Sequence, residues 1–224
     1  MWQAIGGVLP SAVGVAVSPI PIIAIVLMLG TPRARSNGVA FASGWIVGLT
    51  TVAVLIVVLA SEADDSHSGS STAVNIAKVL IGMLFLVMAA QQWRQRPRAG
   101  HSATTPAWME AIDQFSATKS FGLGVALSAM NPKNLALTGA AAASIAQAGL
   151  DGAETAVSIA VLLVVGAVTV AGPVVYFLVS PATASRTLGS VKEFMSDHNA
   201  VIMFVLLLVL GAKVLGDGIG GLAA

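Results

Sequence analysis

The sequence GVALSAMNPKN occupies residues 124–134, and a related sequence, GVAVSPIP, occupies residues 14–21. Each copy lies inside a long apolar run, and in each copy a serine is followed within four residues by a proline. Proline removes a hydrogen bond from a helix and leaves carbonyl groups of the preceding turn without a donor. The two sequences therefore predict two helices that are each broken near the middle.

The composition indicates an integral membrane protein. Of the 224 residues, 56% are hydrophobic and 9% are charged, and the mean hydropathy is +0.89. Soluble domains carry about 25% charged residues, so 11 Lys and Arg with 10 Asp and Glu are too few to cover a soluble domain of this size. A net charge of +1 predicts no nucleic-acid partner, and the absence of cysteine excludes disulfides and thiolate metal sites.

Apolar runs of about 20 residues, long enough to cross the hydrocarbon core as a helix, occur six times. We predict membrane spans at residues 4–29, 39–60, 73–93, 121–148, 153–179 and 201–221. The runs are continuous rather than alternating, which favours helices over the strands of a membrane barrel. The expected fold class is therefore an all-α integral membrane protein with six transmembrane helices.

Charged residues between the spans predict the orientation of the chain. Basic residues follow spans one, three and five, as at Arg33, Arg94 and Arg186, whereas acidic residues such as Glu62 and Asp151 follow spans two and four. Short cytoplasmic loops retain Lys and Arg. We therefore expect a multi-pass protein of the plasma membrane with both termini on the extracytoplasmic side.

The two related sequences also predict an internal repeat. They lie about half a chain apart, each in the first span of a half that contains three predicted spans, so the second copy enters the membrane from the opposite side. We expect two inverted three-helix repeats, residues 1–93 and 118–224, in which helices one and four are broken. Residues 94–117 are expected to form a cytoplasmic loop, and apolar residues at helical spacing predict an interfacial amphipathic helix over 105–115.

The prolines mark the candidate site. Pro19 and Pro21 lie near the middle of the first predicted span, and Pro132 lies near the middle of the fourth. Transporters with inverted repeats bind substrates at such midplane breaks. We expect these prolines to shape the site and to act as hinges, and a tolerated kink is the alternative.

Lys133 is the only ionisable side chain near the middle of a predicted span, and no acidic residue within the spans is available to pair with it. Its burial costs about 2.5–3.5 kcal/mol on the insertion scale, so it needs partners. Candidates are the carbonyls freed by proline, the amide oxygens of Asn131 and Asn134, and a negative group on a transported molecule. Two alternatives remain open: burial favours the neutral amine for part of the time, as a proton-coupled carrier requires, or the lysine is structural.

Other chemistry is missing from the predicted spans. The histidines, His67, His101 and His198, all lie outside them, and no carboxylate lies near the middle of any. Intramembrane metal sites and cation carriers use such ligands. We therefore expect neither an enzyme, nor a metal site, nor a cofactor.

Two motifs resemble those of known families. Pro19-Ile20-Pro21 and Asn131-Pro132-Lys133 resemble the paired motifs of the lysine-exporter superfamily, in which amino-acid exporters carry glycine between the two prolines. Trp108-Met109 followed by the sequence of residues 131–135 is similar to the sulfolipid- and peptidoglycolipid-addressing protein family. This resemblance covers nearly the whole chain and implies movement of large cell-envelope glycolipids across the plasma membrane, beside a larger lipid exporter.

On this resemblance we expect a transporter that exports a glycolipid or another amphipathic molecule by alternating access. Lys133 is expected to engage a polar or anionic head group, and Asn131 and Asn134 to orient it. A non-transporting accessory subunit of a larger lipid-export complex and an exporter of small, amino-acid-like solutes remain alternatives. Glycine faces such as Gly44 with Gly48 suit close helix contact, and a homodimer is compatible with such faces.

Overall fold

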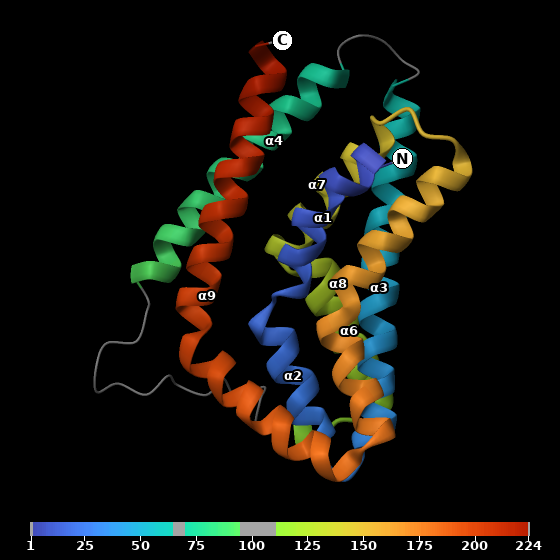
Figure 1. Cartoon of the computed structure of the whole chain (residues 1–224), viewed down its shortest axis with the longest axis vertical. Helices are drawn as coiled ribbons and strands as arrows, with labels where there is room; N and C mark the ends of the chain where they lie inside the picture. The colour runs from blue at the N-terminus through green and yellow to red at the C-terminus, as the bar shows by residue number, and fades with distance from the viewer. Residues whose placement is uncertain (1, 65–69, 95–110, 224) are drawn as a thin grey trace.

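The computed structural model describes residues 2–64, 70–94 and 111–223. Within these ranges the chain is helical, without a strand, which confirms the all-α prediction. The elements are α1 (Trp2–Ala16), α2 (Pro19–Leu29), α3 (Ala34–Asp64), α4 (Ser70–Arg94), the 3-10 helix η1 (Ile112–Gln114), α6 (Ala117–Val125), the π-helical segment η2 (Ala126–Met130), α7 (Pro132–Ala146), α8 (Gly152–Val179) and α9 (Pro181–Ala223) (Figure 1).

Four of the described helices, α3, α4, α8 and α9, are long and apolar enough to cross a membrane. The pair α1 and α2 adds a fifth span if it is counted as one helix bent by 53° at its break. The predicted span at residues 121–148 is divided among α6, η2 and α7 and does not count as a continuous span. The chain is thus a multi-pass membrane protein with four or five apolar spans among the described residues.

The last helix is longer than its predicted span. The predicted span covers residues 201–221, but α9 begins at Pro181 and contains 43 residues. At 1.5 Å per residue its length is about 65 Å, roughly twice the hydrocarbon thickness of a bilayer. Its first part carries Arg186 and Lys192 and passes beneath α2 before the helix rises beside α4 (Figure 1).

Glycines bring α3 and α6 into backbone contact. A Cβ atom on Gly44 would collide with the carbonyl of Phe121, and a Cβ atom on Gly124 would collide with the carbonyl of Phe41. Gly48, one turn beyond Gly44, lies against the Ser128 side chain of η2, whose hydroxyl would collide with a Cβ atom at this position. The glycine face expected for close helix contact is therefore used within the chain, where small residues let two membrane helices approach each other.

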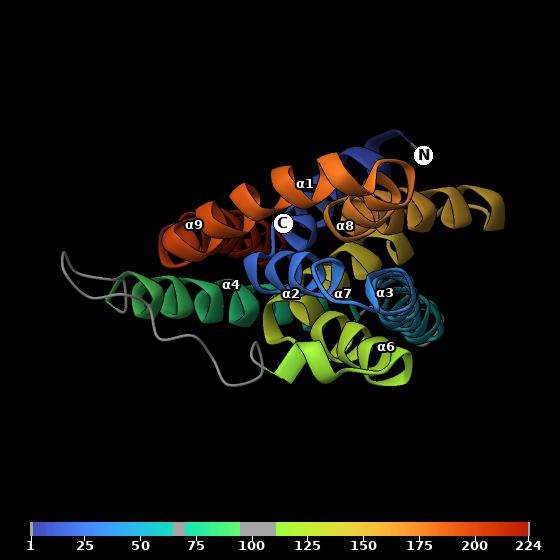
Figure 2. The same cartoon turned by 90° about the horizontal axis from the view of Figure 1, so that it is seen from below.

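A second pair of helices, α4 and α9, packs through its own glycines. The Cβ position of Gly82 lies 2.6 Å from the backbone nitrogen of Leu215, and Asn75 Nδ2 donates to the Gly221 carbonyl over 2.8 Å. Viewed from below, α4 and α9 lie together at one side of the bundle (Figure 2). Both helices make few contacts with α1, α3 and α7. Apart from α4, the helices that α9 contacts most are α2 and α8.

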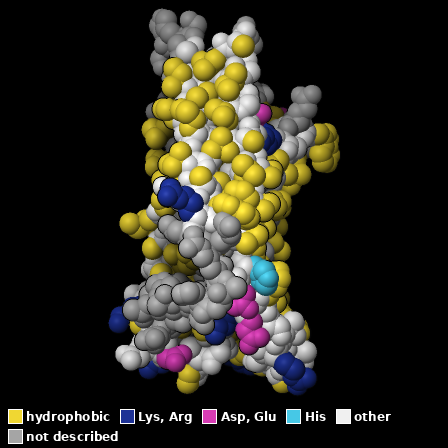
Figure 3. All heavy atoms as spheres, turned by 90° about the vertical axis from the view of Figure 1, so that its left-hand side faces the viewer, with side chains coloured by type: hydrophobic (Ala, Val, Ile, Leu, Met, Phe, Trp, Pro, Cys, Tyr) yellow, Lys and Arg dark blue, Asp and Glu magenta, His cyan; other side chains and the backbone are white. Residues whose placement is uncertain are grey.

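The surface is that of a protein surrounded by lipid. Large apolar side chains are exposed along several helices, including Leu55, Leu80, Val164 and Val209. Figure 3 shows a broad hydrophobic surface, with most of the charged side chains in that view gathered at the lower end. Exposed apolar area of this extent is rare on soluble monomers and normal where lipid is the solvent.

Most of the loop between α4 and α6 lies outside the described residues. Residues 105–110 of the predicted amphipathic helix lie outside the described residues. Within its remaining part, Ile112–Gln114 form the 3-10 helix η1, in which Ile112 is buried, and the Phe115 backbone is extended. The boundaries proposed at residues 93, 94, 117 and 118 remain predictions.

Candidate functional site

The break between α1 and α2 leaves backbone carbonyl groups without their helical hydrogen-bond donors. Pro19 has no N–H for the Val15 carbonyl, and Pro21 has none for the Val17 carbonyl. The Ser18 hydroxyl donates to the Val15 carbonyl over 2.7 Å and so replaces the first missing donor. The Val17 carbonyl is left for a donor from elsewhere in the chain.

Two further carbonyls of α1 are released because the helix stops. The Ser18 N–H bonds to the Ala16 carbonyl at 2.9 Å instead of to the Gly14 carbonyl, its partner in a regular helix. Thr169, on α8, donates its hydroxyl to the same Ala16 carbonyl over 2.6 Å. The Gly14 carbonyl therefore also needs a donor from outside α1.

Lys133 supplies the donors that are missing at this break. Its Nζ atom lies 2.7 Å from the Gly14 carbonyl oxygen, 3.4 Å from the Val17 carbonyl oxygen and 2.6 Å from Ser18 Oγ. An ammonium group has three N–H donors, so each donor of Lys133 has one acceptor. The side chain is only 1% exposed, and no carboxylate within residues 2–64, 70–94 and 111–223 forms an ion pair with it.

The second break is built differently. After the π-helical segment η2, Asn131 adopts an extended backbone conformation (φ −71°, ψ 119°), and its side chain accepts the Lys133 N–H over 3.0 Å. Asn131 is thus the N-cap of α7, and Pro132 occupies the first helical position, which has no helical acceptor for an N–H. The cap fixes where α7 begins and therefore where the lysine side chain starts.

Asn134 joins the two breaks. Its Nδ2 atom donates to the Leu127 carbonyl over 3.0 Å, and its Oδ1 atom lies 3.2 Å from Ser18 Oγ. Both asparagine and serine are buried. We call the network of Lys133, Asn134 and Ser18, with the carbonyls of Gly14 and Val17, the break latch.

The two related sequences carry the same local hydrogen bond. Ser18 donates to the Val15 carbonyl, and Ser128 donates to the Val125 carbonyl over 3.1 Å, in both cases to the residue three positions earlier. Sequence reasoning noted both serines in the motif but gave them no role. For Ser18, the signal that could have identified it is a hydroxyl directly before a proline that removes a donor.

Of the residues expected at the site, the structure brings Lys133 and Asn134 against the break formed by Pro19 and Pro21. The carbonyls, one of three kinds of partner considered for the lysine, are the ones that bind it here, together with Ser18. Asn131 lies nearby but uses its side chain as a cap. Sequence reasoning did not identify Ser18 or Thr169.

Two apolar grooves begin at the two breaks. One has a volume of about 420 Å³, lies between α1 and α9, and includes Gly14 and Leu210 in its lining. The other has a volume of about 400 Å³, lies among α3, α4 and α7, and includes Pro132 and Lys78. Volumes of 300–1,000 Å³ are typical of small-molecule sites.

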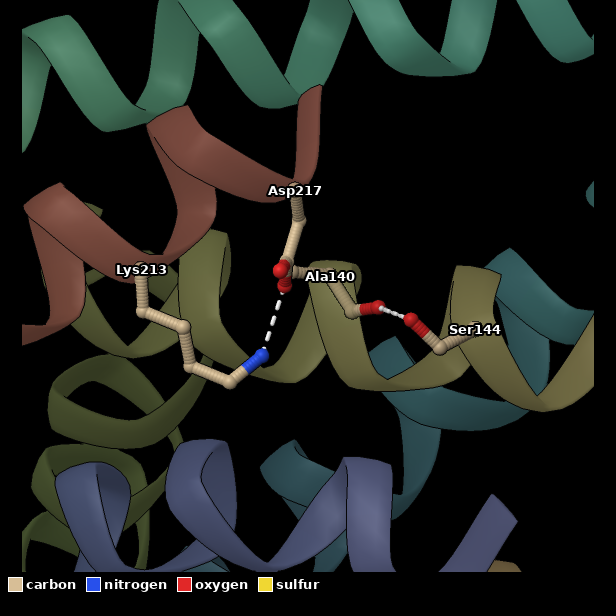
Figure 4. A network of polar contacts seen from close by, with 4 residues as sticks. All are labelled: Ala140, Ser144, Lys213 and Asp217. Atoms are coloured by element: carbon tan, nitrogen blue, oxygen red, sulfur yellow. Dashed lines mark hydrogen bonds and ion pairs between the residues drawn. The ribbon is translucent and has the colours of Figure 1, made fainter. Parts of the chain in front are cut away.

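An ion pair on α9 contrasts with the buried lysine. Lys213 Nζ lies 2.6 Å from Asp217 Oδ2 one turn away, and the two side chains are 44% and 51% exposed (Figure 4). The same view contains Ser144 of α7, whose hydroxyl donates to the Ala140 carbonyl over 2.9 Å. An exposed pair at this spacing contributes only about 0.3–0.5 kcal/mol.

Replacing Ser18 with alanine is expected to lower the free energy of unfolding by about 1–2 kcal/mol, because the Val15 carbonyl and the Lys133 ammonium each lose a buried partner. The control is Ser43→Ala, since the exposed Ser43 hydroxyl bonds only to the Val39 carbonyl of its own helix. That change is expected to stay within about 0.5 kcal/mol. Thermal unfolding of the purified protein in detergent measures both, and equal effects would contradict the role of Ser18.

A family model for Sap, the sulfolipid-1-addressing protein, matches residues 8–220 of this chain. The match covers both breaks, all the residues of the break latch and, except for Gly6, both grooves described above. No curated protein and no solved structure matches the chain.

Proposed function

This chain belongs to the sulfolipid-1-addressing protein family, and on that premise we propose that it exports a cell-envelope glycolipid or another amphipathic lipid across the plasma membrane. The observation that carries the proposal is the pair of broken helices joined by a buried lysine, because broken helices at the midplane are where transporters bind their substrates. The apolar grooves that begin at these breaks suit a substrate with hydrocarbon chains.

The proposed architecture has six spans in two inverted repeats, with the predicted span at residues 121–148, which is divided among α6, η2 and α7, as the broken fourth span. Three features of the packing support it. The same serine bond occurs at both breaks, α1 packs along α8 as α6 packs along α3, and α4 pairs with α9. In this arrangement both termini face the extracytoplasmic side.

The proposed mechanism uses the break latch as the closed arrangement of the site. In this arrangement Lys133 is satisfied by the chain itself and has no free donor. A polar or anionic head group that offers acceptors can take the place of the Gly14 and Val17 carbonyls. The lysine then releases α1 and α2, and the backbone at Pro19, Pro21 and Pro132 absorbs the change in angle between helices. No catalytic residue and no cofactor takes part.

Transport by the purified chain in liposomes tests this function. A fluorescent glycolipid, followed by its exposure to a membrane-impermeant quencher, is compared with a labelled amino acid under an imposed pH gradient and membrane potential. Glycolipid movement faster than in protein-free liposomes is the expected result. Amino-acid movement instead would assign the chain to small-solute export.

The same assay addresses a second candidate function. The complete saturation of Lys133 by partners within the chain is also what a structural lysine requires, and this favours an accessory subunit of a larger lipid exporter as the alternative. Movement of neither substrate, in liposomes that hold both gradients, would support that alternative.

A further inference from the structure

The groove among α3, α4 and α7 differs from the groove between α1 and α9 in one respect. Its lining is apolar, with Ile56, Ile81, Pro132 and Gly139 among its residues, except for Lys78. The other groove has only glycine and apolar residues in its lining. The first groove therefore combines a hydrocarbon environment with a single positive charge.

Lys78 has no counter-ion among the described residues. The ion pair described above joins Lys213 and Asp217 on α9, and no described acid lies in the lining around Lys78. The lysine lies three residues inside the apolar part of α4, which begins at Asn75. At that depth the ammonium reaches the head-group region while the stem stays in hydrocarbon.

The dimensions of the groove identify the kind of occupant. Along α7 it runs from Pro132 to Ala143, a distance of about 16 Å at 1.5 Å per residue. This length is about half of the roughly 30 Å thickness of the hydrocarbon core, so the apolar groove matches one extended acyl chain of one leaflet.

The direction of the helices orients such a chain. Helix α7 runs from the break at Pro132 toward the end of the molecule that holds both termini, and α4 runs the opposite way (Figure 1). The deep end of the groove is therefore at Pro132, next to Lys133 of the break latch, and Lys78 lies toward the membrane surface.

We propose that this groove binds one acyl chain of an anionic lipid, with Lys78 contacting the anionic group of its head and the chain end lying against Pro132. The inference rests on the proposed function, since it assigns a binding site to the exported lipid. Because Lys78 lies toward the end of the molecule that holds both termini, the head group of this lipid lies in the extracytoplasmic leaflet in the proposed orientation, and the site holds the lipid after the break latch has released it.

Photolabelling at equilibrium, without any gradient, tests the site separately from transport. The probes are a phosphatidylglycerol and a phosphatidylcholine that carry the same diazirine near the end of one acyl chain, each a minor component of phosphatidylcholine vesicles. Labelled peptides are mapped by mass spectrometry. We expect the anionic probe to label residues of the groove about fivefold more than the zwitterionic probe, the effect of one lysine near a membrane surface.

Two pairs of variants make the test specific. Lys78→Gln is expected to lower anionic labelling of the groove about fivefold, whereas Lys213→Gln, on the exposed face of α9, leaves it unchanged. Ala77→Trp fills this groove from an exposed position and is expected to remove labelling by both probes. Val209→Trp fills the α1–α9 groove instead and is expected to leave it unchanged.

Equal labelling by the two wild-type probes, or anionic labelling that survives Lys78→Gln, would overturn the proposal. Absence of groove labelling by either probe would also overturn it. If labelling follows the expected pattern but liposomes show no transport, the site stands and the export function fails. If transport occurs without labelling, the export function stands and the site fails.

Discussion

Lys133→Met is expected to abolish glycolipid export and to lower the free energy of unfolding by about 3 kcal/mol. The wild-type ammonium donates to the Gly14 and Val17 carbonyls and to Ser18 in a region closed to solvent. Methionine fills much of the same space but donates nothing, so two carbonyls lose their donor, at about 1–3 kcal/mol each. Relief from burying a charge offsets part of this loss.

Export must be measured per folded molecule, because the variant is also less stable. The folded fraction is determined by size-exclusion chromatography and thermal unfolding in detergent before reconstitution. Lys213→Met is the control, since it removes an exposed lysine whose ion pair contributes little. Export by Lys133→Met at the wild-type rate per folded molecule would exclude any role of the lysine in transport and leave it a structural residue.

The sequence predicts the positions of the two helix breaks but not the hydrogen bonds that join them. The positions of Pro19, Pro21 and Pro132 identify where the helices break, and the pattern of proline identifies which carbonyls lose donors. The pairing of these carbonyls with Lys133 depends on how the first and fourth predicted spans face each other, which no single span encodes. Ser18 has both kinds of partner: the proline beside it indicates the local bond to the Val15 carbonyl, whereas its contact with Asn134, 116 residues away, cannot be predicted from one span.

Asn131 illustrates a signal that was present in the sequence and read differently. Its side chain was expected to orient a head group, but an asparagine directly before a proline has the residue types preferred at the N-cap and first position of a helix. The structure uses it as that cap. The role in substrate binding remains a prediction for this residue.

Hydropathy alone does not predict where these helices begin and end. Residues 201–221 were predicted as a span, but charged residues earlier in α9 do not end the helix, because helix formation does not require apolar residues. Conversely, residues 121–148 are apolar enough to suggest a span but are divided at Asn131. Hydropathy reports which residues prefer lipid, and backbone hydrogen bonding decides where a helix begins and ends.

Gly124→Ala is expected to destabilise the fold by about 3 kcal/mol or more, for the addition of a single methyl group. A Cβ atom at this position meets the Phe41 carbonyl and lies 2.8 Å from the Trp45 backbone nitrogen. Both contacts are backbone of α3, so no side chain can rotate away, and α3 and α6 must separate. Insertion of a methyl group into a tight core costs about 1–3 kcal/mol even where side chains can adjust, and rigid backbone leaves no such relief.

Gly122 provides a matched control two residues away on the same helix. No neighbouring atom lies within 4 Å of its Cβ position, so Gly122→Ala adds the same methyl group to open space. Alanine favours the helix by about 1 kcal/mol over glycine, so this variant is expected to be neutral or slightly more stable. Thermal unfolding of both variants in the same detergent separates helix propensity, which they share, from the α3–α6 contact, which only Gly124 makes. Similar unfolding temperatures would mean that α3 and α6 do not pack at this distance, and the position of η2, which contacts both helices, would then need revision.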